Sequence, residues 1–239
     1  MTHARSNGRP GSPLQGDTIL FSEMTPAPEW AQRFHHWYDT EHIPNRRGLP
    51  GFLSAQRYRS TAKDSYLAVY EMESASALST EEYRVVKEQP SDETRWMLSN
   101  VDGFTRYTCN QISLREAGDG KGHSLGAGEL DAPVLYAVWF DVPAERKADF
   151  DAWYDEDHVP LLMQCEDWRM VRRFDVASGE PGRYTRLALH YLADVAALDS
   201  DARKRARETP WRARIASEPW FRGVYDVFVR HGARQILSE

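Results

Sequence analysis

The sequence predicts an α+β protein in which two tandem ferredoxin-like repeats, each with the order βαββαβ, form one barrel within a single chain. Two observations predict this fold class: a motif recurs at a constant offset, and strand-like and helix-like segments follow in the same order in both halves. A single ferredoxin-like unit leaves one face of its sheet bare, because both helices cover the other face. Two units can bury these faces by packing together, so we expect an intramolecular barrel.

The recurring motif carries the strongest signal of duplication. Residues 34–44 read FHHWYDTEHIP and residues 150–160 read FDAWYDEDHVP, so that Trp37 corresponds to Trp153 at an offset of 116 residues. The offset continues to Arg57 and Arg173 on the following segment. Such self-similarity indicates a repeated structural unit. We therefore divide the chain into a flexible tail (1–16), repeat 1 (17–115), a Gly-rich and polar linker (116–132) and repeat 2 (133–239).

Each element follows from local patterning, since short apolar runs predict strands and apolar residues three and four apart predict helices. In repeat 1 the expected order is strand Thr18–Glu23, helix Pro28–Ile43, strands Phe52–Arg59 and Tyr66–Met72, charged helix Ser79–Gln89 and strand Phe104–Ser113. In repeat 2 it is strand Val134–Asp141, helix Ala144–Val159, strands Trp168–Asp175 and Tyr184–Leu192, helix Val195–Glu208 and strand Gly223–Arg230. Polar turns at 60–65 and 177–183 separate the second and third strands of each repeat.

The end of the first helix in each repeat supplies the candidate catalytic residues, a tyrosine, an acid and a histidine. These are Tyr38, Glu41 and His42 in repeat 1 and Tyr154, Asp157 and His158 in repeat 2. At 100° per residue, each acid falls within the apolar stripe of its helix. Burial and the negative end of the helix dipole are both expected to raise the carboxyl pKa. The same dipole favours the protonated form of the histidines.

Two interpretations of this helix end remain open. In the functional one, the histidine transfers a proton near neutral pH and the phenol donates a hydrogen bond to a developing oxyanion. In the structural one, the histidine caps the last turn and the acid pairs with a strand arginine. Asp39 and Asp155 are expected on the opposite, solvated side of the helix.

Candidate substrate-binding residues lie on the second and third strands. Arg57 and Arg173 recur on the second strand, where a guanidinium can bind a carboxylate or enolate, or pair with the helix acid. His190 lies on the third strand of repeat 2, with Tyr70 as its approximate counterpart. The basic run 203–207 is interpreted as a solvated helix face.

Composition narrows the possible partners to a small-molecule substrate. The net charge of −6 argues against nucleic acid, and no apolar stretch is long enough for a membrane span. With only two cysteines and no signal peptide, we expect a cytoplasmic protein. Phosphate-loop, dinucleotide and zinc-protease motifs are absent from the sequence, so we expect neither a cofactor nor a metal. A homo-oligomer is compatible with the sequence.

The motif resembles those of EthD-like proteins of the dimeric α+β barrel superfamily. The resemblance rests on Trp-Tyr-Asp-x-Glu-His-Ile-Pro, then on GLPGF at 48–52 and RYR at 57–59. It implies ferredoxin-like folds with a pocket between sheet and helices. Members include isomerases, decarboxylases, dehydratases and cofactor-free monooxygenases that act on small, often aromatic molecules. Repeat 2 departs from the pattern at 164–168, where QCEDW replaces GLPGF.

The leading functional hypothesis is a cofactor-independent enzyme acting on a small cyclic or aromatic metabolite, of proton-transfer isomerase or lyase type. A lyase would be a decarboxylase or a dehydratase. The alternatives are a cofactor-free monooxygenase and a non-catalytic small-molecule-binding or scaffold protein. Because the repeats differ beside the motif, we expect one dominant site.

Overall fold

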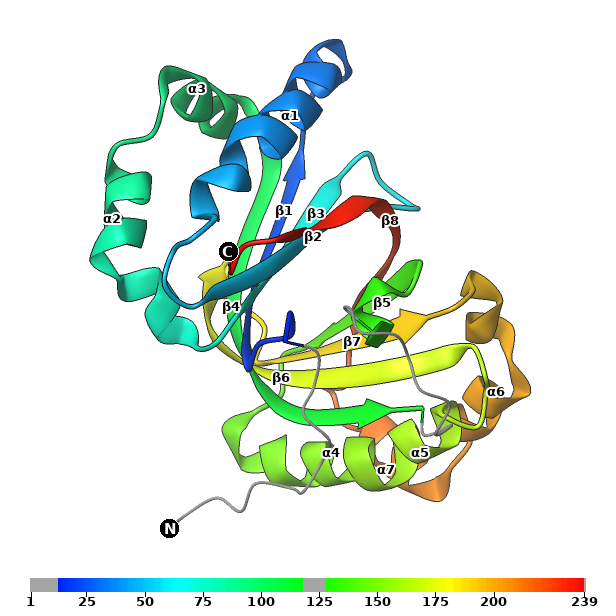
Figure 1. The fold of residues 1–239 in the computed structure, drawn as a ribbon. Helices are drawn as coiled ribbons and strands as arrows, with labels where there is room; N and C mark the ends of the chain where they lie inside the picture. The colour runs from blue at the N-terminus through cyan, green and yellow to red at the C-terminus, as the bar shows by residue number, and fades with distance from the viewer. Residues whose placement is uncertain (1–12, 118–127, 239) are drawn as a thin grey trace.

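Eight antiparallel strands close into one barrel in the computed structural model, which describes residues 13–117 and 128–238 (Figure 1). The strands of repeat 1 are β1 (Thr18–Thr25), β2 (Phe52–Ser60), β3 (Tyr66–Met72) and β4 (Asp102–Glu116). Those of repeat 2 are β5 (Val134–Phe140), β6 (Trp168–Glu180), β7 (Arg186–Leu192) and β8 (Val224–Ile236). The order around the barrel is β1-β3-β2-β8-β5-β7-β6-β4. The predicted intramolecular barrel of two ferredoxin-like repeats is therefore confirmed.

The two repeats meet along two long strand pairs. β2 pairs with β8 and β6 pairs with β4, so both edges of each sheet are hydrogen-bonded to the other repeat. Closure of this kind leaves no unpaired sheet edge. It also explains why β4, β6 and β8 run further than the sequence predicts, because local patterning does not report pairing with a distant strand. The predicted turn at 177–183 begins inside β6 for this reason.

Apolar side chains from both sheets fill the barrel, including Ile19, Phe21, Phe174 and Leu189. One buried ion pair crosses from repeat to repeat, with Arg172 Nη1 donating to Glu71 Oε1 at 2.6 Å. The predicted tail and linker lie partly outside the described residues, at 1–12 and 118–127. Their described parts are packed: Gly16 donates its backbone N–H to Glu71, and Leu130 is buried in the barrel core.

Helices cover the outer face of each half of the barrel (Figure 1). Repeat 1 contains α1 (Ala31–Trp37), α2 (Glu81–Glu88) and α3 (Asp92–Asn100); repeat 2 contains α4 (Lys147–Trp153), α5 (Val159–Leu162), α6 (Asp201–Arg207) and α7 (Pro210–Ala216). Short 3₁₀ turns lie at Pro28–Trp30, Pro44–Arg46, Ala75–Ser79, Gly128–Asp131, Ala144–Arg146 and Val195–Asp199. Within the described ranges, no helix is long and apolar enough to cross a membrane.

The sequence analysis missed α3 and α7. Each follows directly on a predicted charged helix and starts at a hydroxyl cap, Ser91 Oγ accepting from Thr94 N and Thr209 Oγ1 from Arg212 N. A proline stands at each junction, Pro90 before the first cap and Pro210 after the second. Because proline cannot continue a preceding helix, the charged segment of each repeat divides into two helices set at an angle. These second helices complete the wall above the sheet.

Candidate functional site

Both repeated helices end in a π turn, over Tyr38–His42 and Tyr154–His158. The backbone N–H of Ile43 donates to the Tyr38 carbonyl at 3.1 Å, and that of Val159 donates to the Tyr154 carbonyl. Such bonds, five residues apart, widen the turn and are frequent at functional sites. A helical wheel with a constant 100° step therefore fails beyond Tyr38 and Tyr154.

The predicted position of the acids in the apolar stripe is wrong for this reason. Glu41 is half-exposed, and its Oε1 accepts hydrogen bonds from Ser91 Oγ and, at 2.6 Å, from Thr94 Oγ1. Asp157 is equivalent, with its Oδ2 accepting from Thr209 Oγ1 at 2.6 Å. Each carboxylate thus joins the π turn to the start of a later helix, α3 for Glu41 and α7 for Asp157. Neither is among the residues that line a cavity with the histidines.

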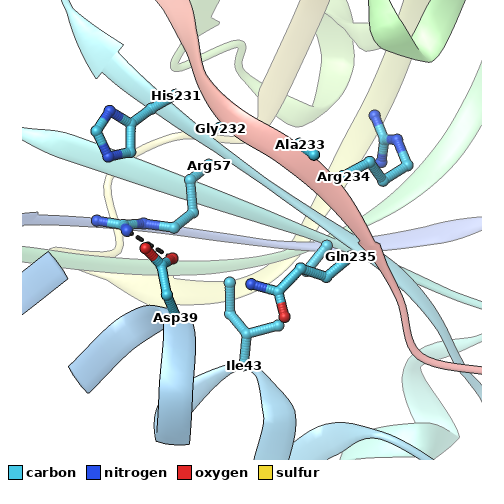
Figure 2. A pocket seen from close by; sticks show the side chains of 9 residues that line it. Asp39, Ile43, Arg57, His231, Gly232, Ala233, Arg234 and Gln235 are labelled. Carbon is cyan, nitrogen blue, oxygen red and sulfur yellow. Dashed lines mark hydrogen bonds and ion pairs between the residues drawn. The ribbon is translucent and has the colours of Figure 1, made fainter. Parts of the chain in front are cut away.

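The strand arginines are bound by the helix aspartates that the sequence analysis expected to be solvated. Arg57 Nη1 donates to Asp39 Oδ1 at 2.9 Å (Figure 2), and Arg173 Nη1 lies 2.8 Å from Asp155 Oδ2. Each guanidinium also lies over the ring of the π-turn tyrosine, at 4.5 Å from Tyr38 for Arg57. Both arginines are therefore engaged in ion pairs, and neither lines the cavities that contain the repeated histidines; their role in binding substrate stays a prediction.

Arg57 lines a separate, small pocket of about 240 Å³ at the β2–β8 junction, together with Asp39, His231 and Gln235 (Figure 2). His35 Nδ1 lies 2.8 Å from Arg57 Nη2 and accepts its hydrogen bond. Burial and the Arg57 charge lower the pKa of His35 to about 4. The Arg57 guanidinium in this pocket is therefore already bound by Asp39 and His35.

Two larger cavities lie between sheet and helices, one in each repeat. The first cavity, about 810 Å³, is lined by His42, Arg46, Tyr70 and Arg106 together with apolar side chains such as Leu98. The second cavity, about 460 Å³, is lined by Tyr154, His158, Trp168 and His190, and by Arg203, Arg207 and Arg212. Both repeated histidines thus line a cavity, as the functional interpretation of the helix end requires. Tyr38 lies behind the first cavity and is not among its lining residues.

Hydrogen bonds orient His190 and Tyr154 in the second cavity. Trp168 Nε1 donates to His190 Nδ1 at 3.1 Å, and since an indole N–H only donates, Nδ1 must be an acceptor. Burial keeps the pKa of His190 well below its ordinary value, so the ring is neutral and carries its proton on Nε2. That N–H donates to the Tyr154 hydroxyl oxygen at 3.0 Å. The Tyr154 proton is therefore left for another acceptor.

His158 is the opposite tautomer, with its proton on Nδ1. Its Nδ1 lies 3.2 Å from the Ala206 carbonyl, which can only accept, so Nδ1 carries the proton and Nε2 a lone pair. Burial lowers the pKa of His158 to about 4, and the Ala206 bond opposes this only in part. The expectation that the helix end favours the protonated histidine is wrong, because desolvation outweighs the weak dipole. No hydrogen-bond partner for Nε2 occurs in the described part of the chain.

The first cavity lacks this arrangement. The Tyr38 hydroxyl lies 3.8 Å from Met24 Sδ and interacts with the Tyr70 side chain, whose own hydroxyl has no partner at hydrogen-bonding geometry among residues 13–117 and 128–238. The His42 ring packs against Trp37 with ring centres 4.2 Å apart, and within the same ranges its nitrogens have no partner. Arg46 lies over the Tyr70 ring at 5.1 Å. The orientation of this histidine is therefore set by packing alone.

The sequence analysis missed the residues that distinguish the second cavity. Trp168 aligns with Phe52 at the same offset of 116, and this difference was a readable signal that an N–H donor replaces a hydrocarbon. The basic run 203–207 was predicted to be a solvated face, which is correct for Lys204, Arg205 and Arg207, although Arg207 also borders the second cavity; Arg203 is only partly exposed. No group of three or more metal-ligating side chains gathers among the described residues.

Comparison with known proteins places the fold. No family model and no curated protein sequence matches the chain. An anthrone oxidase-like protein of known structure matches over 95% of this chain and 96% of its own, with a TM-score of 0.64 and 12% identity. Proteins described provisionally as monooxygenases, from Lactobacillus acidophilus and Fusobacterium nucleatum, each match with a TM-score of 0.54, at 10% and 12% identity. They cover 90% and 93% of this chain and 94% and 93% of their own.

The chain has the dimeric α+β barrel fold. In this dimeric α+β barrel protein, both halves of the barrel belong to one polypeptide, and the solved neighbours are matched over nearly their whole length. Identities this low establish the fold and not the activity. The narrower EthD-like resemblance stays a prediction.

Proposed function

We propose that this protein is a cofactor-independent enzyme that moves a proton on a small cyclic or aromatic molecule in the second cavity. The observation that carries the proposal is the pairing of a free lone pair with a free proton at one cavity, on His158 Nε2 and the Tyr154 hydroxyl. The two rings are neighbours, with centres 5.1 Å apart. One group can accept a proton from carbon while the other donates a hydrogen bond to the oxygen that gains charge.

The proposed step starts from a ligand whose C–H group lies next to a carbonyl. His158 Nε2 takes the proton, the electron pair of the C–H bond moves toward the carbonyl, and Tyr154 O–H stabilises the enolate oxygen. Return of the proton to a different carbon completes an isomerisation. In a dehydratase the enolate instead expels a β-hydroxyl group, which leaves as water with a proton from His158. In a decarboxylase the electron pair comes from the bond to the carboxylate of a β-keto acid instead of from a C–H bond, so that carbon dioxide leaves and a solvent proton is added to the carbon. His190 acts as a positioning residue, because it holds the phenol oxygen and leaves the proton free.

The size and lining of the cavity suit such a ligand. A volume of about 460 Å³ lies within the usual range for small-molecule sites. Tyr136, Phe140 and Phe221 supply aromatic walls, and the buried Tyr154 phenol has a raised pKa, so that it remains a donor at neutral pH. Neutral His158 remains an acceptor under the same conditions.

Deuterium exchange tests the proposal without knowledge of the natural substrate. Wild-type protein and His158→Ala are incubated anaerobically in D₂O with a panel of cyclic ketones, including anthrone, whose methylene loses a proton to give an aromatic phenolate. We expect the wild type to catalyse exchange on at least one compound and His158→Ala to lose most of that rate. An equal rate in both proteins would remove His158 from the mechanism.

Cofactor-free monooxygenation is the second candidate. It is supported by the descriptions of the solved neighbours as anthrone oxidase-like and provisionally as monooxygenases. The same carbanion would react with O₂, so that a CH₂ group becomes C=O, with one oxygen atom in the product and the other released as water. Oxygen uptake in step with anthraquinone formation would favour this candidate. Deuterium exchange without oxygen uptake would favour the isomerase or lyase, and binding without either reaction would favour a non-catalytic binding protein.

A further inference from the structure

The charges that line the second cavity are all positive. Arg203, Arg207, Arg212 and Arg222 line it, and no Asp or Glu is among its described lining residues. None of the four forms an ion pair within residues 13–117 and 128–238, although most other arginines of repeat 2 do. Arg203 and Arg212 are partly buried at this cavity, whereas Arg207 and Arg222 are exposed. Gathering several cations at one cavity without counter-ions is unfavourable, and an anion bound among them would relieve the repulsion.

The outward-facing cations of the same two helices show the contrast. Lys204 pairs with Asp201 at 2.8 Å, Arg205 donates to Gln164 at 3.0 Å, and Arg214 pairs with Asp149 at 2.7 Å. Arg203 and Arg212 have only uncharged partners. Arg203 donates to the Leu198 carbonyl and lies over the Tyr136 ring at 6.0 Å, and Arg212 donates to the Arg207 carbonyl and lies over the Phe221 ring at 5.5 Å. Burial, Arg207 and Arg203 together lower the pKa of Arg212. Lys204 and Arg214 thus have acidic partners, whereas no described acid pairs with the arginines that line the cavity.

The arginines also lie next to the proposed proton acceptor. Arg203 and Arg207 are four residues apart on α6, so they project from one face of that helix. Between them lies Ala206, whose carbonyl holds His158 Nδ1 at 3.2 Å. Arg212 approaches from α7 across the same cavity. An anionic group bound by these side chains would place the rest of a ring compound over His158 and Tyr154.

We propose that the second cavity binds ring compounds that bear an oxyanion, a carboxylate or a phosphate ester, between Arg203, Arg207 and Arg212. Guanidinium groups match both anions through paired N–H donors. The inference rests on the proposed function for the position of the reacting carbon, and on the charge of the cavity for the ligand class. It adds to that function an anionic substrate.

Calorimetric titration tests the ligand class directly. The wild type is titrated with 2-naphthoate, 2-naphthyl phosphate and the neutral 2-naphthalenemethanol, which share one ring system. We expect one or both anions to bind at least about 10-fold more tightly than the alcohol, because a charge-assisted hydrogen bond contributes about 1.5–3 kcal/mol. Whichever anion binds more tightly shows whether the site prefers a carboxylate or a phosphate ester. Affinity for the anions should also fall as salt is raised from 50 to about 300 mM.

Variants locate the binding site. Arg203→Gln and Arg212→Gln should each weaken binding of the preferred anion about 10-fold or more and leave the alcohol within about threefold. Arg205→Gln is the matched control, because it removes the same charge from the outer face of α6. Neither cavity variant removes an ion pair between described residues, so melting temperatures should stay close to that of the wild type.

Two results would overturn the inference: anions that bind no more tightly than the alcohol, or Arg205→Gln weakening them as much as Arg203→Gln. The wild-type comparison requires no variant and stands even if one fails to fold. Failure of the proposed function gives a different result. If anions bind but no compound exchanges deuterium, the proposed anion site stands and the proposed proton transfer is contradicted. If neutral ketones exchange deuterium but anions bind no more tightly than the alcohol, the proton transfer stands and the anion site is contradicted.

Discussion

The two cavities occupy equivalent places in the two repeats and differ in what their polar groups can do. The register that pairs Leu20 with Tyr70 in repeat 1 pairs Tyr136 with His190 in repeat 2, so Tyr70 and His190 are structural counterparts. In repeat 2 that histidine is held by Trp168 and in turn holds Tyr154. In repeat 1 the counterpart of Trp168 is Phe52, which has no N–H to donate. Two side-chain differences are therefore enough to convert a packed tyrosine cluster into an oriented hydrogen-bond chain.

The charged side chains that line the two cavities also differ between the repeats. At an offset of 120 residues, Tyr83 of the first cavity corresponds to Arg203 of the second. Arg106 in the first cavity donates to the Tyr83 hydroxyl at 2.8 Å, whereas in the second cavity an arginine, Arg203, takes the place of Tyr83 and contacts Tyr136. The segments that differ beside the motif, 48–51 and 164–167, line neither cavity. The asymmetry between the repeats thus lies on the sheet and on the helices that follow its third strand, α2 and α6.

The largest effect should separate the two histidines. His158→Ala removes the proton acceptor and is expected to lower turnover about 10²- to 10⁴-fold, the usual contribution of a general base. His42→Ala, in a cavity without the oriented phenol, should lower it less than about 10-fold. The measurement is turnover on a compound identified by exchange, with melting temperature as the control for folding. Equal large losses would show that the cavities act together; equal small losses would exclude both histidines.

The hydrogen bond between Trp168 and His190 allows a test of what causes the difference between the two cavities. Trp168→Phe leaves His190 Nδ1 buried without a donor, which should cost about 1–3 kcal/mol of unfolding free energy and reduce turnover. Trp153→Phe is a matched control, because Trp153 Nε1 is buried and has no partner among the described residues. Denaturant unfolding measures both. If the two variants are equally destabilised, the hydrogen bond does not explain the special arrangement of repeat 2.

Stability should depend on pH through the buried histidines. The pKa of His158 falls from about 6.5 in the unfolded chain to about 4 in the folded one, so between these values the unfolded state binds more protons. The free energy of unfolding should therefore decrease as the pH falls from about 6.5 to about 4, and His158→Gln should reduce that slope. His42 and His190, whose pKa values are also lowered, contribute in the same sense. A slope unchanged by His158→Gln would contradict the buried, neutral state.

The smallest effect concerns the acids. Asp157→Asn keeps an oxygen acceptor for Thr209 and should change stability by less than about 1 kcal/mol, the usual scale of a helix cap, with little loss of turnover. Glu41→Gln should have an equally small effect on stability and turnover. The two acids are thus the residues at which we expect no difference between the repeats. A loss of 100-fold or more in Asp157→Asn would instead support the proton-transfer role that the sequence suggested.

The sequence by itself determined the duplication, the order of strands and helices, and the barrel formed from two bare sheet faces. Each follows from local periodicity and from apolar surface that must be buried somewhere. It also placed a tyrosine and a histidine at each helix end, which is where the cavities lie. These conclusions depend on residues close together in the chain, so patterning was sufficient.

Only the tertiary structure decided what the polar groups do. The π turn rotated Glu41 and Asp157 away from the apolar stripe, and the aspartates two residues earlier bound the strand arginines instead. Burial set the protonation of His158 against the helix dipole, and partners distant in sequence, Ala206 and Trp168, set the tautomers of two histidines. Desolvation and hydrogen bonding act between residues that meet only when the sheet and the second helices pack. Periodicity along the chain carries no record of those contacts, and so the chemistry of the cavities, unlike their location, was decided by folding.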